Sequence, residues 1–106
     1  MDERLEFLPS AKCGTLAVST AVVDLSTASV SPIVDKMVKV IIQIDPTGGN
    51  VRMTLDGATD PEGATTGFRY DAGDIIELNR QEAINAKFIR DAADATLQIQ
   101  AMGTKV

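Results

Sequence analysis

The stretch KMVKVIIQIDPTGGNVRMTLD, residues 36–56, decides the fold of this chain. Residues 36–44 predict a strand, because β-branched residues recur at every second position and form one apolar face. That face comprises Val38, Val40, Ile42 and Ile44. Residues 45–49 (DPTGG) predict a turn, since proline sets one φ and glycine permits positive φ. Residues 50–56 alternate again and complete a strand–turn–strand unit, with an inward face of Val51, Met53 and Leu55.

Further short strands are predicted on both sides of this unit. They cover residues 15–23, 68–70, 75–78, 85–90 and 95–102. Asn79 with Glu82 three residues later favours one helical turn over 79–84. Six or seven short strands and no sustained 3.6-residue apolar period predict an all-β protein. We expect a single small antiparallel β-sandwich or jelly-roll-like domain over residues 15–106, preceded by an N-terminal arm over residues 1–14.

The arm, MDERLEFLPSAKCG, mixes charged and apolar residues. Leu5, Phe7 and Leu8 form an apolar group outside any strand-like alternation. Two interpretations stay open: an ordinary edge element packed on the domain, or an extended arm that docks on a neighbouring subunit. Its acidic start lacks the basic and apolar regions of a secretory signal, so we expect none.

Composition excludes several classes of function. The 106 residues include no histidine and a single cysteine, Cys13, so imidazole catalysis, cysteine–histidine pairs and cysteine-based metal clusters are not expected. Ten basic residues are spread thinly in a chain of net charge −5, which argues against nucleic-acid binding. No apolar run approaches the roughly 20 residues of a membrane span. We expect a soluble protein that is not an enzyme and has no cofactor.

Acidic residues gather around the loop at 57–67. Asp56, Asp60 and Glu62 alternate with glycine and offer oxygen ligands for calcium, but Asp-Gly and Asp-Pro are ordinary turn residues, which is the favoured interpretation. Asp71 and Asp74 are a weak candidate for an acid–base pair, and Asp91 and Asp94 frame a predicted hairpin turn. Between residues 56 and 74 five acids face one base, Arg69, so this end is expected to be negative.

Residues for contacts with other proteins are predicted from their position. We select the arm residues Leu5, Phe7 and Leu8, and Asp56 and Asp60 at the start of the loop, because Gly- and Pro-rich loops commonly carry binding. Apolar residues on faces expected to meet water suggest a subunit interface, although packing under a loop explains them equally. These are Met37, Ile41 and Met102.

Three successive segments carry a resemblance: VRMTLDGATDP (51–61), TTGFRYDAGDIIEL (65–78) and AKFIRDAADATLQIQAM (86–102). They resemble small β-sandwich virion proteins of tailed bacteriophages, most strongly at 54–57 (TLDG), 72–74 (AGD) and 94–97 (DATL). The resemblance implies a structural role in the virion after synthesis in the host cytoplasm. It implies a capsid decoration (cement) protein, or a head-, neck- or tail-associated one, that forms a homo-oligomer (trimer or dimer) and binds the major capsid protein or other virion proteins.

The TLDG turn is also similar to one in chitobiase-type C-terminal sandwich domains. This chain has Met53 where those domains carry an aromatic residue just before the turn. The second hypothesis is therefore a module that binds glycans or a host surface, for which aromatic faces are scarce here: Phe7, Phe68, Tyr70 and Phe88.

Overall fold

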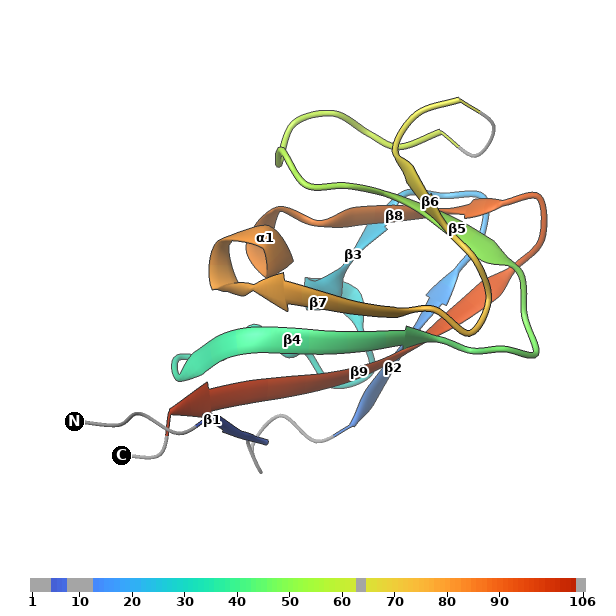
Figure 1. The fold of residues 1–106 in the computed structure, drawn as a ribbon. Helices are drawn as coiled ribbons and strands as arrows, with labels where there is room; N and C mark the ends of the chain where they lie inside the picture. The colour runs from blue at the N-terminus through green and yellow to red at the C-terminus, as the bar shows by residue number, and fades with distance from the viewer. Residues whose placement is uncertain (1–4, 8–12, 63–64, 105–106) are drawn as a thin grey trace.

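The computed structural model describes residues 5–7, 13–62 and 65–104 and forms two packed antiparallel sheets (Figure 1). Sheet A contains β1 (Leu5–Phe7), β2 (Gly14–Val18), β4 (Met37–Ile44), β7 (Ile75–Asn79) and β9 (Ala95–Thr104). Sheet B contains β3 (Val23–Asp24), β5 (Asn50–Thr54), β6 (Phe68–Tyr70) and β8 (Lys87–Asp91). The predicted all-β sandwich is confirmed.

The order of the strands defines the margins of the sandwich. In sheet A, β1 and β2 both pair with β9, which is followed by β4 and then β7. In sheet B the order is β3, β8, β5 and β6. Residues 71–74 join β6 to β7, so the edge strands of the two sheets lie at the same margin (Figure 1).

The core lies between the sheets and follows the predicted alternation. In β2 and β7 every second residue is buried, and β4 is buried at Val40, Ile42 and Ile44. Phe88 on β8 is the largest fully buried side chain, with none of its surface exposed. Each fully buried side chain of this kind contributes roughly 1.5–3 kcal/mol through removal from water.

The first residues of β4 depart from the predicted faces. Met37 pairs with Gly103 and Lys39 with Met102, so a β-bulge leaves Val38 as an extra residue. The bulge shifts the alternation, and Met37 is 1% exposed while Val38 is 39% exposed. The prediction of Met37 as a surface contact residue is therefore wrong.

One arginine holds the start of this bulged strand. The guanidinium of Arg80 donates to the carbonyl oxygen of Val34 at 2.8 Å and to that of Met37 at 2.9 Å. Arg80 begins α1 (Arg80–Asn85), which carries the predicted capping box between Asn79 and Glu82. The helical turn predicted there is confirmed.

Within the described ranges no helix has both the length and the apolar character to cross a membrane.

The predicted turns at 45–49 and 91–94 do not make hairpins. The DPTGG turn joins β4 of sheet A to β5 of sheet B, and DAAD joins β8 of sheet B to β9 of sheet A. The turn at 71–74 also crosses between the sheets. These three inter-sheet turns gather at one end of the sandwich, on the right of Figure 1.

Backbone hydrogen bonds tie the three inter-sheet turns together. The amide of Gly49 donates to the carbonyl of Asp94 at 2.8 Å, and the amide of Asp45 to that of Thr96 at 2.8 Å. The amide of Gly73 donates to the carbonyl of Ile44 at 2.7 Å. These bonds satisfy amide and carbonyl groups of the turns within the protein.

The N-terminal arm is described in part. Its residues 5–7 form β1, whose backbone pairs with residues 102–104 of β9 in the same chain. The edge-element interpretation thus holds for these three residues, while Leu8 lies outside the described residues. The strand predicted over 15–23 ends at Val18, and Val22 beyond it is exposed.

Candidate functional site

A cleft of about 620 Å³ lies beside the loop that connects β5 to β6. It is lined by Met53, Thr54, Leu55, Asp56, Thr59, Gly67 and Phe68. Phe68 pairs with Met53 across the two strands, so both side chains project from the same face of sheet B. Met53 is fully buried, but Phe68 at the edge is 70% exposed. The cleft therefore brings an uncovered aromatic ring next to the loop.

Hydrogen bonds within the loop shape one wall of this cleft. The hydroxyl of Thr54 donates to the carbonyl oxygen of Thr59 at 2.6 Å, which satisfies a buried polar side chain. Oδ1 of Asp56 accepts from the amides of Ala58 (2.9 Å) and Thr59 (2.8 Å), and Oδ2 accepts from the Thr59 hydroxyl (2.6 Å). These hydrogen bonds lower the pKa of Asp56 to about 2, and the one from the Thr59 hydroxyl has the largest effect.

The pKa of Asp56 gives a prediction for the folded protein. Because the pKa falls from 3.8 in a free chain to about 2, the contribution of Asp56 to stability is complete above about pH 4 and is lost as the pH falls through 2. A carbon-detected NMR titration of the Asp56 carboxyl measures this midpoint directly. Thr59→Val removes the largest of the stabilising hydrogen bonds and is expected to move the midpoint up toward 3.8. A midpoint of 3.8 in the unchanged protein would contradict the described turn.

The other two acids of the proposed calcium group have different partners. Asp60 forms an ion pair with Nζ of Lys87 at 2.9 Å, and Glu62 accepts from the hydroxyl of Thr65 at 3.2 Å. In the part of the chain that the structure describes, no three His, Cys, Asp or Glu side chains come together to hold a metal ion. Asp56 and Asp60 thus lie in the same loop but bind different partners, Asp56 its own turn and Asp60 the side chain of Lys87.

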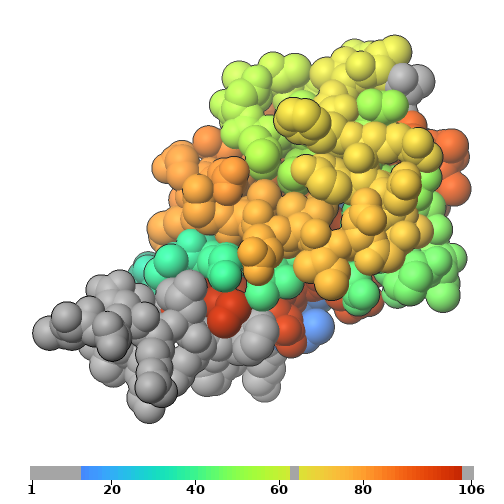
Figure 2. Space-filling model, viewed as in Figure 1, coloured from blue at the N-terminus to red at the C-terminus, as the bar shows by residue number. Residues whose placement is uncertain are grey.

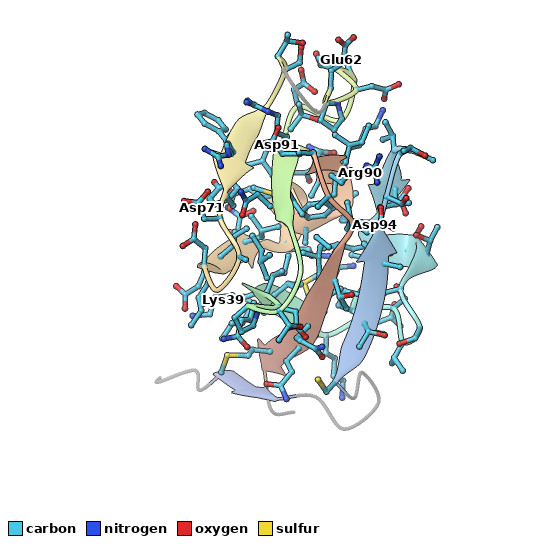
Figure 3. All side chains as sticks on the ribbon, turned by 90° about the vertical axis from the view of Figure 1, so that its right-hand side faces the viewer. Lys39, Glu62, Asp71, Arg90, Asp91 and Asp94 are labelled. Atoms are coloured by element: carbon cyan, nitrogen blue, oxygen red, sulfur yellow. The ribbon has the colours of Figure 1, made fainter. Side chains whose placement is uncertain are left out.

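Asp91 does more than frame a turn. Its carboxylate, on the side chain labelled in Figure 3, lies 2.8 Å from Nε of Arg69 on β6 and 3.5 Å from Nε of Arg52 on β5. Asp91 thus links β8 to β5 and β6. Arg52 also donates to the carbonyl oxygen of Gly67 at 3.0 Å. The side chains of Arg52 and Asp91 are each less than a fifth exposed, so water screens this pair less than it screens a surface pair.

The remaining acid pairs also serve the fold. Asp71 lies 3.4 Å from Nη2 of Arg69, and Asp74 accepts from the amide of Asp71 at 2.8 Å. Asp94 accepts from the hydroxyl of Ser19 at 2.8 Å and from Arg90 at 2.7 Å, and these two contacts lower its pKa. Of the five acids at 56–74, Asp60 is offset by a base from a distant strand, Lys87 on β8.

A second hollow, of about 430 Å³, lies on the outer face of sheet A. Its lining includes the predicted contact residue Ile41, which is half-buried, together with Cys13, Gln43, Ile75, Gln98 and Gln100. Ile75 is 66% exposed. Met102 is half-buried and pairs with Lys39, so it belongs to the same outer face.

The predicted contact residues are not gathered in one place. Ile41 and Met102 share the outer face of sheet A, while Asp56 and Asp60 lie in the loop beyond β5. Leu5 and Phe7 are placed by their backbone in β1. Phe68 was counted among the aromatic residues but not among the predicted contact residues, because a three-residue strand shows no alternation that would separate an exposed ring from a buried one. Of the four aromatic residues counted for a glycan-binding module, Phe88 is fully buried and so offers no ring for stacking.

Comparisons with protein-family models, with curated proteins and with solved structures gave no match for this chain.

Proposed function

We propose that this chain is a non-enzymatic structural protein of a tailed-phage particle, a capsid decoration protein that forms a homo-oligomer and binds major capsid subunits. The turn motifs at 54–57, 72–74 and 94–97 supply the link to phage virion proteins. The part of the proposal that concerns binding to other proteins is supported by one feature of the surface.

That feature is the margin formed by β6 and β7. Both are edge strands, and they follow each other in the chain through residues 71–74. Each carries an exposed apolar side chain that lines a hollow, Phe68 on β6 and Ile75 on β7. Figure 2 shows this margin in yellow to orange across the surface. Unpaired strand edges with apolar side chains are suited to contact with another protein.

The acidic residues support a role without catalysis. Asp71, Asp74, Asp91 and Asp94 each accept hydrogen bonds or form ion pairs that join strands and turns. A general acid–base pair needs carboxyl groups that face a substrate cleft. Of the described aspartates, Asp56 lines the larger cleft, and its carboxylate is held by its own turn.

The test is made on particles of the phage whose genome encodes this chain. Mass spectrometry of purified particles is expected to detect the protein, and light scattering at micromolar concentration is expected to show an oligomer.

Ile75→Lys places a charge on the β6–β7 margin and is expected to weaken binding to particles lacking the protein roughly 10-fold or more. Val38→Lys, a matched change at a residue exposed elsewhere on sheet A, is expected to leave binding unchanged. Absence from particles would overturn the proposal.

A further inference from the structure

The cleft beside the β5–β6 loop combines an apolar wall with a fixed negative charge. Leu55 and the exposed ring of Phe68 supply apolar and aromatic surface. Asp56 lines the same cleft. The amides of Ala58 and Thr59 hold its carboxylate in one orientation, so it does not have to be ordered when a ligand binds.

The charges around the cleft favour a cationic ligand. Of the three acids in the loop, Asp60 is paired with Lys87, whereas the hydrogen bonds described for Asp56 and Glu62 come from uncharged groups. On the side of Gly67 and Phe68, the positive charges of Arg52 and Arg69 are offset by ion pairs with Asp91 and Asp71. The hydrogen bonds of its own turn stabilise the charged form of Asp56 and keep its pKa below the ordinary value.

We propose that this cleft binds the side chain of a lysine or arginine presented by a partner protein. The aliphatic part of that side chain packs on Leu55 and the ring of Phe68, and the charged end lies against the ring face and the Asp56 carboxylate. A volume of about 620 Å³ accommodates such a side chain. The inference rests on the proposed function only in taking a protein as the partner.

The experiment is an NMR titration of the full-length ¹⁵N-labelled protein with Nα-acetyl-lysine methylamide and with Nα-acetyl-arginine methylamide. The amide chemical shifts of residues 55–59 and 67–68 are expected to change and to saturate with a Kd on the order of millimolar. Binding this weak is expected because the ligand offers a single side chain without the rest of a protein interface. The norleucine derivative has the same aliphatic chain without the charge. It is expected to bind at least about 3-fold more weakly, since the attraction of a cation to a ring and a carboxylate is lost.

Two variants test the residues, and one serves as the control. Phe68→Ala and Asp56→Asn are each expected to weaken binding of the lysine derivative roughly 3- to 10-fold, and Phe68→Ala changes an exposed side chain that the fold does not need. Ile75→Ala, at the other hollow, is expected to leave binding unchanged.

Three results would overturn the inference. They are equal binding of the norleucine derivative, absence of shifts at 55–59 and 67–68, and tighter binding of a chitin disaccharide at the same amides, which would identify a glycan site. None of these results bears on whether the protein is found in particles, so the two proposals fail separately.

Discussion

Replacing Phe88 by alanine is expected to lower the free energy of unfolding by about 3–5 kcal/mol, the range for removing a buried phenylalanine. Phe88 lies on β8 between its neighbours Val23 on β3 and Met53 on β5, and its side chain is fully buried. A small domain has roughly 5–15 kcal/mol of stability in total, so this one change removes a large share. Urea denaturation followed by circular dichroism measures the loss.

The matched control is Phe68→Ala, which deletes the same atoms from a ring that is 70% exposed. Its expected effect is within about 0.5 kcal/mol, as for most surface substitutions. The melting temperature should separate the two variants by roughly 10 °C or more in a domain of this size. Equal losses would mean that Phe68, not only Phe88, belongs to the core in solution.

Replacing Gly49 by alanine is the second change with a large expected effect. A Cβ atom at this position would overlap the carbonyl oxygen of Ala93 and lie 2.8 Å from its carbonyl carbon. The obstacle is backbone in the neighbouring inter-sheet turn, which cannot rotate away as a side chain does. We expect a loss of about 1–3 kcal/mol, typical of overpacking, and a weakening of the contact between the turns at 45–49 and 91–94.

Gly48→Ala is the control, because a Cβ there would come no closer than 3.3 Å to the backbone of Asp94 and Ala95. Its loss should be smaller than that of Gly49→Ala in the same denaturation experiment. Protection of the Gly49 amide, which donates to Asp94, can be followed by hydrogen exchange in Gly48→Ala. If both variants lose the same stability, the close approach of the two turns is not what requires glycine.

The two glycines of this turn show how a correct prediction can have a different cause. Their residue type predicted a turn because glycine permits positive φ. Among the residues that the structure describes, the glycines with positive φ are Gly57, Gly67 and Gly73, and neither Gly48 nor Gly49 is among them. Gly49 is needed because another turn approaches it closely, and nothing in residues 45–50 alone indicates which segment that will be.

Most strand positions were predictable, since alternation at every second residue reports which face meets the core. The pattern failed at Met37 and Val38, where one extra residue reverses the two faces. A bulge has no signature in this stretch, because both residues are apolar and fit either face. The prediction of a contact residue at Met37 was wrong for that reason.

The candidate site was harder to predict than the fold. Asp56 was selected from the sequence, and it does line the larger cleft. Phe68 was not, although its exposed ring gives that cleft its aromatic wall. Its exposure follows from the position of β6 at the edge of sheet B, which depends on pairing between strands that are distant in the sequence.

Local patterns by themselves determined that this chain forms short antiparallel strands joined by turns, with one capped helical turn at 80–85. They did so because alternation, turn residues and capping residues act over a few neighbouring positions. Only the tertiary structure decided that the turns at 45–49, 71–74 and 91–94 cross between sheets rather than close hairpins. The same residue types serve both purposes, and the choice depends on which distant strands complete each sheet and bury its apolar face.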